Sequence, residues 1–191
     1  MTARSARLCG SAVLALCLLM ASARADISLF GSYWDNVARM AAQNDASAVQ
    51  RLVAGGNDPN EEDDQGRTGL LVSAINGNLQ IAAILIKAGA HLDVKDRLGN
   101  TPLSYAAERD HVELAQLLLD LGAAVDPQNR NGMTPLMIAA SRGETAIVEA
   151  LLAKGADPHK TDYTGRDAVS WGADSHRQSV ILALRRAVAH R

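Results

Sequence analysis

Residues 99–126 read GNTPLSYAAERDHVELAQLLLDLGAAVD, and this segment is the most informative part of the chain because its pattern recurs. Segments 66–93 (GRTGLLVSAINGNLQIAAILIKAGAHLD) and 132–159 (GMTPLMIAASRGETAIVEALLAKGADPH) repeat it at an interval of 33 residues. Two sets of glycines keep the same interval, namely Gly66, Gly99, Gly132 and Gly165, and Gly56, Gly89, Gly122 and Gly155. A fixed period of this length predicts a repeat protein, in which one structural unit is copied along the chain.

Each copy carries the signals of two short helices. A threonine stands where a side-chain oxygen caps the first helix, and a proline follows in two copies at the first helical position: Thr68, Thr101, Thr134, Pro102 and Pro135. The second helix has apolar residues at helical spacing, and a glycine suited to left-handed backbone geometry then ends it. One such unit cannot bury its own apolar face, so the units are expected to stack on one another.

This pattern resembles the ankyrin repeat, which reads G-x-T-P-L-x-x-A-A, followed by an apolar helix ending in L-L and then by G-A-D. Thr101-Pro102-Leu103, Ala106-Ala107 and Leu117-Leu118-Leu119 carry the match in one copy, and Thr134-Pro135-Leu136 carries it in the next. The resemblance covers about residues 31 to 190. It implies an all-α fold, an ankyrin-repeat solenoid of stacked helix-turn-helix units. We expect three full repeats between divergent N- and C-terminal capping repeats, with units of about 31–65, 66–98, 99–131, 132–164 and 165–191.

Several positions depart from the family pattern. Gly69 replaces the usual proline, which predicts a first helix weakened by about 0.5–1 kcal/mol, and Asp110 replaces a consensus glycine. In the end units Asp35 and Asp167 take the place of the capping threonine, and the last helix is expected from Ser175 to Ala189. The family's turn-supporting histidine is replaced by Leu71, Ser104, Met137 and Ser170.

Residues 1–25 are typical of a secretory signal peptide that is cleaved from the chain. Arg4 and Arg7 form a basic end, Leu8 to Met20 is an apolar run of 13 residues, and Ala23-Arg24-Ala25 has the small-x-small form of a cleavage site. We therefore expect a mature ankyrin-repeat domain at 26–191, located in the periplasm or, alternatively, outside the cell, with no membrane contact after cleavage. A retained membrane anchor and a lipoprotein acylated at Cys17 are the other readings.

The amino-acid composition limits which ligands and cross-links are expected in the predicted mature chain. Both cysteines, Cys9 and Cys17, lie within residues 1–25, so neither disulfides nor zinc thiolates are expected beyond them. Removal of three arginines with this segment leaves 16 Lys and Arg against 21 Asp and Glu, a net charge of −5, which disfavours nucleic-acid binding. The five histidines are scattered, and His111 stands where ankyrin repeats often carry a structural histidine. No metal and no cofactor are expected.

Catalysis is not expected either, because no nucleophile motif, phosphate loop or metal cluster is present. The nearest approach to a catalytic triad is Ser170 and His176 with Asp167 or Asp174. These residues fall in the last repeat, where helix capping and stacking explain the pattern. We interpret Trp34 and Trp171, in the two end units, as packing residues and expect Tyr105 to be partly buried.

The resemblance also implies where a partner binds. Partners of ankyrin repeats usually contact the turn tips and the exposed face of the first helices, which together form a concave groove. Applied position by position, this predicts the following partner-binding residues: Arg67, Asn76, Lys95, Arg97, Leu98, Asn100, Arg109, Arg130, Asn131, Met133, Arg142, Tyr163 and Arg166.

Arginine is the most frequent residue of this set, so an acidic chain would present a basic groove to an acidic protein surface. In the alternative, each arginine pairs with a nearby acid such as Asp64, Asp96 or Asp162, and such surface pairs contribute only about 0–1 kcal/mol. The sequence leaves both possibilities open.

We therefore expect a monomeric, non-enzymatic module that binds an unidentified protein partner in the periplasm. The chain looks like the small exported bacterial ankyrin proteins, and some relatives are associated with support of a periplasmic catalase, so a stress-defence enzyme of this kind is one expected partner. The alternatives are an immunity-type inhibitor of a toxin or enzyme, and a secreted effector that binds host proteins.

Overall fold

The computed structural model describes residues 36–189. The predicted signal segment, Trp34 and the capping residue Asp35 lie outside the described residues. Within 36–189 the regular structure is helical, apart from two isolated antiparallel bridges between Glu62 and Thr68 and between Thr161 and Asp167. The helices form five pairs: α3 (Val37–Ala42) with α4 (Ala46–Ala54), α5 (Gly69–Asn76) with α6 (Leu79–Lys87), α7 (Pro102–Glu108) with α8 (Val112–Asp120), α9 (Pro135–Arg142) with α10 (Thr145–Ala153), and α11 (Ala168–Asp174) with α12 (Gln178–Ala189).

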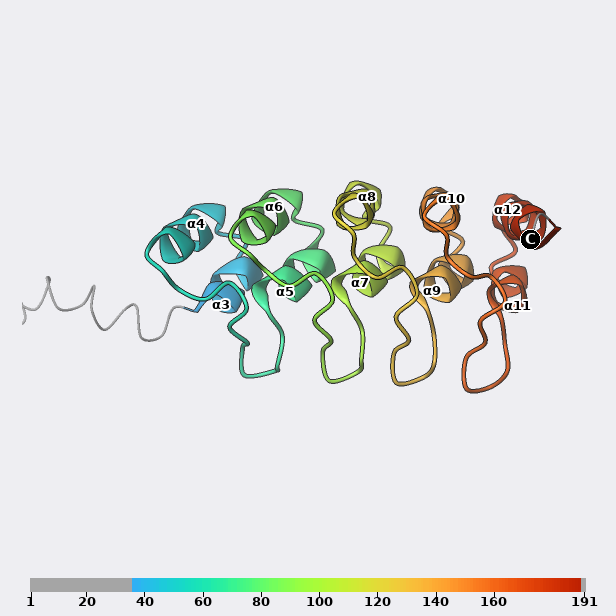
Figure 1. Cartoon of the computed structure of the whole chain (residues 1–191), viewed down its shortest axis with the longest axis horizontal. Coiled ribbons are helices and arrows are strands. Elements are labelled where there is room, and N and C mark those ends of the chain that lie inside the picture. Colours follow the sequence, from blue (N-terminus) through green and yellow to red (C-terminus); the bar gives the residue numbers. More distant parts are fainter. Residues whose placement is uncertain (1–35, 190–191) are drawn as a thin grey trace, which may run out of the picture. The chain divides into compact units, whose positions relative to one another are not determined.

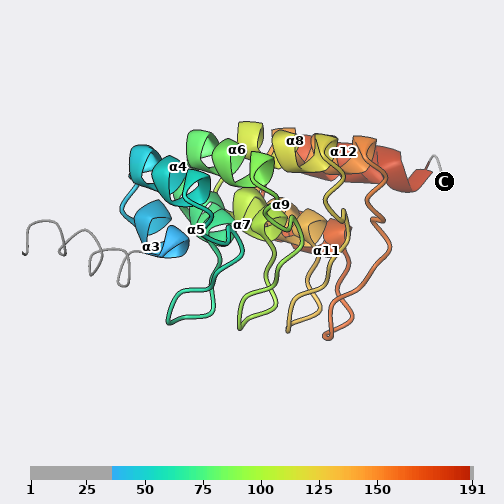
Figure 2. The same cartoon turned by 60° about the vertical axis from the view of Figure 1, so that its left-hand side comes forward.

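The described helix pairs stack in chain order into two rows. Helices α3, α5, α7, α9 and α11 form one row, and α4, α6, α8, α10 and α12 form the other (Figures 1 and 2). Each helix packs against its partner in the pair and against the corresponding helices of the adjacent pairs. The loops that lead into α5, α7, α9 and α11 all extend from the same side of the stack. Each predicted unit contains one of these pairs.

The capping residues predicted from the sequence begin the first helices. The Oγ1 atoms of Thr68, Thr101 and Thr134 accept hydrogen bonds from the backbone N–H three residues later, and Asp167 does the same at the start of α11. The second helices are followed by glycines with φ between 87° and 94°: Gly56, Gly89, Gly122 and Gly155. Because left-handed backbone is strained for other residues, these positions favour glycine.

The core lies between the two rows and runs through the stack. Leu103, Leu118 and Leu151 are completely buried, and every described helix contributes buried apolar residues to this core. Gly69 is also buried, and a Cβ there would lie 3.0 Å from Leu85 Cδ1 and 3.2 Å from Val37 Cγ1. The absence of a side chain therefore lets α5 approach its neighbours closely, which gives the departure from proline a packing reason.

A further left-handed position joins the two helices of each pair. It is occupied in order by Asn44, Gly77, Asp110, Gly143 and His176, with φ from 55° to 81°. Asp110 therefore adopts the conformation of the glycine that it replaces. The structure corrects the expected start of the last helix, which is Gln178 and not Ser175, because Ser175 ends α11 and a right-handed helix cannot include the backbone of His176.

Candidate functional site

The loop before each of the helices α5, α7, α9 and α11 is closed by one acidic or amide side chain. Its Oδ1 atom accepts hydrogen bonds of 2.9–3.0 Å from the backbone N–H groups two and four residues later. The residues recur every 33 positions and are Asp63, Asp96, Asn129 and Asp162. This network supports the turns in a chain that lacks the family's usual histidine.

The second oxygen of each of the three carboxylates holds another side chain in place. Asp63 pairs with Arg67 at 2.7 Å, Asp96 accepts a 2.5 Å hydrogen bond from the Tyr105 hydroxyl, and Asp162 accepts a 3.1 Å bond from Trp171 Nε1. Tyr105 and Trp171 occupy equivalent positions, nine residues after their turn carboxylates. Their rings are thereby oriented from the loop side.

The protonation of these groups follows from the same contacts. Burial would raise the pKa of Asp63, but hydrogen bonds from Arg67 and Gln65 hold that pKa below its ordinary value. At Asp162 burial is likewise outweighed, by hydrogen bonds from Thr164, Arg166 and Trp171, so its pKa is also lowered. Burial, and then the bond to Asp96, raise the pKa of Tyr105. Asp63 and Asp162 are therefore charged and the Tyr105 phenol is neutral at pH 7.

The tips of neighbouring loops are bonded to each other. Arg130 N donates to Leu98 O at 2.9 Å, and Tyr163 N donates to Asn131 O at 3.2 Å. Side chains extend the contact, since Lys95 Nζ donates to Gln128 O at 3.0 Å and Arg97 Nη2 donates to Asp64 O at 3.1 Å. Because of these bonds the loops form one continuous wall beside the first helices. The surface between this wall and helices α5, α7, α9 and α11 is called the groove below.

Two hollows of about 350 Å³ each open into the groove. The Tyr105 hollow lies between α5 and α7 and is lined by Gln65, Arg67, Ile75, Asp96, Arg97, Leu98 and Tyr105. The Trp171 hollow lies across α9 and is lined by Asn100, Glu108, Asn129, Met133, Ile138, Ser141, Arg142 and Trp171. Each combines an aromatic wall and aliphatic side chains with charged and amide groups, which is the usual make-up of a binding site.

The predicted arginines divide into two groups. Arg67, Arg142 and Arg166 pair with Asp63, Glu108 and Asp174 at 2.5–2.7 Å, so pairing occurs, although not with the acids named from the sequence. Arg166 also lies over the Trp171 ring, 3.8 Å from its centroid. Arg97, Arg109 and Arg130 are exposed and form no ion pair within residues 36–189. Arg97 donates instead to the backbone oxygen of Asp64.

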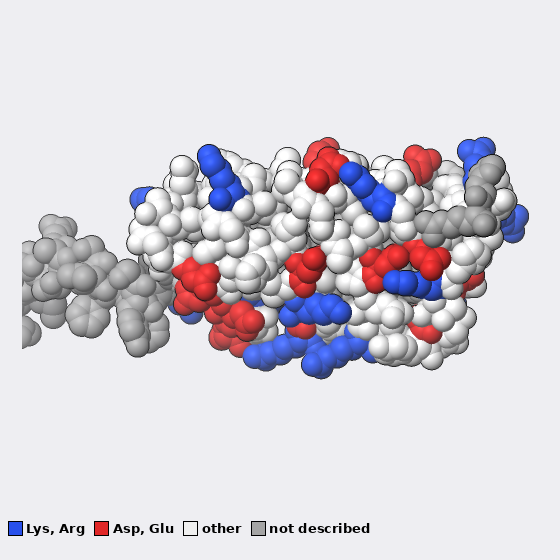
Figure 3. Space-filling model, in the orientation of Figure 1, with Lys and Arg blue, Asp and Glu red and all other residues white. Residues whose placement is uncertain are grey.

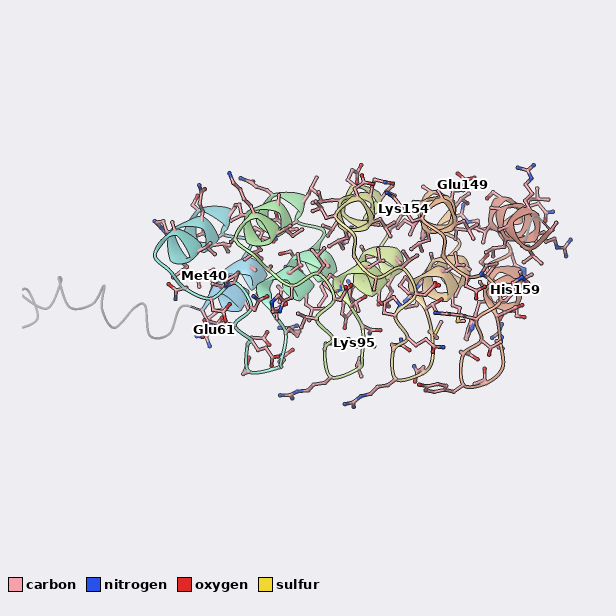
Figure 4. All side chains as sticks on the ribbon, in the orientation of Figure 1. Met40, Glu61, Lys95, Glu149, Lys154 and His159 are labelled. Carbon is pink, nitrogen blue, oxygen red and sulfur yellow. The ribbon has the colours of Figure 1, made fainter. Side chains whose placement is uncertain are left out.

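Charge is unevenly distributed along the loops. The first loop carries the acidic run Glu61-Glu62-Asp63-Asp64, whereas the next two present Lys95, Arg97 and Arg130. Figure 3 shows Lys and Arg side chains gathered below the middle of the stack, with Asp and Glu beside them toward α3. Lys95 is labelled in Figure 4 on the loop between α6 and α7. The basic part of the groove therefore lies near its middle.

Six of the predicted partner-binding residues line the two hollows: Arg67, Arg97, Leu98, Asn100, Met133 and Arg142. Asn131 and Tyr163 lie on the loop tips, and Arg166 lies over the Trp171 ring. Asn76 and Arg109 are exposed at the ends of α5 and α7.

Sequence reasoning missed three residues that shape these hollows. Tyr105 is partly buried as predicted, and Trp171 packs against the core, but both also line the groove. Ile138 occupies the same position in the repeat between them. The sequence did contain a sign of their shared role, because each of the three follows the turn residue of its repeat by nine positions. Packing in the core, however, would also explain aromatic residues at this position.

The residues considered for a catalytic triad form contacts at the two ends of α11. Asp167 Oδ1 accepts from Ser170 N at 2.7 Å and from Ser170 Oγ at 2.6 Å, and Asp174 pairs with Arg166. Within the described residues, no group of three or more His, Cys, Asp or Glu side chains is placed to hold a metal ion. No helix between residues 36 and 189 combines the length and hydrophobicity needed to cross a membrane.

A family model of ankyrin repeats in three copies matches residues 38–129 and 121–188. Because these matches span most of the 191 residues, the chain belongs to the ankyrin-repeat family. The expected all-α solenoid is thereby confirmed. Among curated proteins the comparison finds no match. Ankyrin repeats suggest a protein–protein interaction module, and they are typically non-catalytic.

Proposed function

We propose that this chain is a non-enzymatic module that binds a protein partner in the groove. The observation that carries the proposal is the presence of Arg109 and Arg130, which are exposed and form no ion pair within residues 36–189. Stacking does not require these guanidinium groups, whereas arginine is enriched at the energetic centres of interfaces and matches carboxylates in a bidentate manner.

Apolar side chains beside Arg130 support the same proposal. Leu98 and Tyr163 are 61% and 74% exposed on the loop tips, on either side of the loop that carries Arg130. Exposed apolar residues next to charged ones are typical of an interface with an apolar centre and a polar rim. Since the loop tips are bonded to one another, these side chains are held on a firm wall.

The proposal is tested by capturing partners from the organism's own extract with two charge-reversal variants. Arg109→Glu/Arg130→Glu changes the groove, and the control Arg51→Glu/Arg186→Glu makes the same change in charge on exposed positions of α4 and α12. We expect the wild type and the control to retain the same partner and the groove variant to lose it. Retention by the groove variant would place the binding surface elsewhere.

We also propose that the mature chain acts in the periplasm, because residues 1–25 have the charge, length and cleavage pattern of a signal peptide. Cell fractionation with N-terminal sequencing tests this, and the expected mature N-terminus is Asp26. Support of a stress-defence enzyme such as catalase is a finer form of the proposal that rests on the family resemblance. Recovery of such an enzyme in the capture experiment would support it.

A further inference from the structure

Trp171 is held firmly in the groove before any partner arrives. Its Nε1 atom is bonded to Asp162, whose carboxylate is buried and accepts three other hydrogen bonds in the turn. Arg166 stacks against the ring and is itself fixed by Asp174. The ring also forms part of the Trp171 hollow, beside Ile138 and Met133. A fixed aromatic wall loses little conformational entropy on binding, so it suits an apolar anchor from a partner.

The Tyr105 hollow has the same arrangement of an aromatic ring fixed by a turn carboxylate, two repeat units closer to the N-terminus. The Tyr105 hydroxyl is bonded to Asp96, which closes its own turn through hydrogen bonds to Leu98 N and Asn100 N. Ile75 and the exposed Leu98 complete the apolar part of this hollow. The chain therefore presents two similar pockets in the same register of the repeat.

The distance between the two hollows determines how long a ligand must be to fill both. Helices α7, α9 and α11 lie in one row with α9 between the others (Figure 1). Packed helices are about 8–10 Å apart, so Tyr105 and Trp171 are separated by about 16–20 Å along the row. An extended chain advances about 3.3 Å per residue, and this distance therefore corresponds to about five or six residues.

The charge between the hollows is positive. Arg130 lies on the loop between the tips of Leu98 and Tyr163, and Lys95 is exposed on the preceding loop. Glu108 is the acid that lines the Trp171 hollow, and it is paired with Arg142 at 2.6 Å. A ligand that crosses from one hollow to the other therefore passes a cation that has no acidic partner within residues 36–189.

We propose that the groove binds an extended acidic peptide segment. Two apolar side chains of the segment, about five or six residues apart, enter the Tyr105 and Trp171 hollows, and a carboxylate between them pairs with Arg130. This inference rests on the proposed function and specifies the partner's chemistry. It predicts recognition of an unfolded stretch of a partner, such as a terminus or a long loop, over recognition of a folded surface.

The test is selection of binders from a display library of random twelve-residue peptides on the full chain. We expect enriched peptides to carry two apolar residues at this spacing with Asp or Glu between them. Synthetic copies of an enriched peptide are then measured by fluorescence anisotropy. Moving the apolar residues two positions closer, or replacing the acid by lysine, should weaken binding to the wild-type protein by about tenfold or more.

Protein variants provide the second readout. Trp171→Ala and Arg130→Glu should each weaken the selected peptide by about tenfold or more, while Arg51→Glu/Arg186→Glu leaves its affinity unchanged. Because the peptide changes are measured on wild-type protein, a folding defect in Trp171→Ala does not obscure the result. Enrichment of no motif, of basic motifs, or of peptides insensitive to anchor spacing would overturn the inference.

The two proposals fail in different ways. If the capture experiment recovers a partner that depends on Arg109 and Arg130 while no acidic peptide is selected, the module binds a folded surface and the inference is wrong. If such peptides are selected but no cellular partner is captured, the peptide specificity stands and the proposed partner in that extract is excluded.

Discussion

Replacing Gly132 with alanine tests whether the loop tips are packed against each other as the structure shows. The φ angle of Gly132 is 78°, and a Cβ there would lie 2.7 Å from Tyr163 N and 3.1 Å from Asp162 Cα. The left-handed backbone alone costs an alanine about 1–2 kcal/mol. Displacing Tyr163 would also break its bond to Asn131 O, which adds about 0.5–1.5 kcal/mol. We expect a total destabilisation of about 1.5–3.5 kcal/mol.

The repeat supplies matched controls at the equivalent glycines. Gly165 has a φ of 81° but no atom within 4 Å of a Cβ, so alanine there should cost only the backbone strain of about 1–2 kcal/mol. Gly99 is intermediate, because a Cβ would lie 3.0 Å from Arg130 N. The expected order of destabilisation is therefore Gly132, then Gly99, then Gly165.

Urea unfolding followed by circular dichroism gives the free energy of unfolding for each variant. The difference between Gly132→Ala and Gly165→Ala isolates the contact with the next loop, because the backbone conformation is the same at both positions. Equal destabilisation of these two variants would refute the reasoning, since it would mean that the loop tips do not restrain one another.

Three other changes test the core and the protonation of the fold. Leu118→Ala should destabilise the chain by about 2–5 kcal/mol because Leu118 is fully buried, whereas Leu121→Ala, at a position 49% exposed, should have a much smaller effect in the same urea titration. Burial, and then repulsion by Asp110, raise the pKa of Glu144, so Glu144→Gln should raise the melting temperature at pH 7, with a gain that disappears below the ordinary glutamate pKa of about 4.3. Asp162→Asn keeps one oxygen acceptor, but its amide N–H₂ must then face either Trp171 Nε1 or the backbone N–H groups of the turn, which are also donors. This variant should therefore lower the melting temperature.

The stability contributions of Asp162 and Glu144 depend on pH in opposite directions. Because the pKa of Asp162 is lowered in the folded state, its contribution is present above the pKa of the unfolded chain and is lost as the pH falls through the folded pKa. The deficit of Asp162→Asn should therefore shrink in acid. The raised pKa of Glu144 makes its contribution favourable in acid and lost as the pH rises. A deficit of Asp162→Asn that grows in acid, or a gain of Glu144→Gln that persists at pH 3, would contradict these assignments. A Leu121→Ala variant as unstable as Leu118→Ala would contradict the burial pattern.

The repeat unit could be predicted from the sequence, because the signals that define it are local. Thr101 caps a helix through an N–H only three residues away, and the left-handed backbone of Gly122 follows from steric limits on a single residue. A period of 33 residues then carries these signals along the chain. The start of the last helix was predicted wrongly because His176 has a left-handed backbone, and no glycine at that position indicates this in the sequence.

The construction of the groove could be learned only from the folded chain. The pairing of Arg142 with Glu108 and the contact of Gly132 with Tyr163 join residues of different repeats, which the pattern of a single repeat does not relate. From the sequence alone, paired and unpaired arginines were equally plausible, because pairing depends on side-chain distances in the folded chain, and for Arg142 and Glu108 these distances lie between neighbouring repeats. Burial and pairing are properties of the stacked units, whereas capping and turn formation are properties of each unit alone.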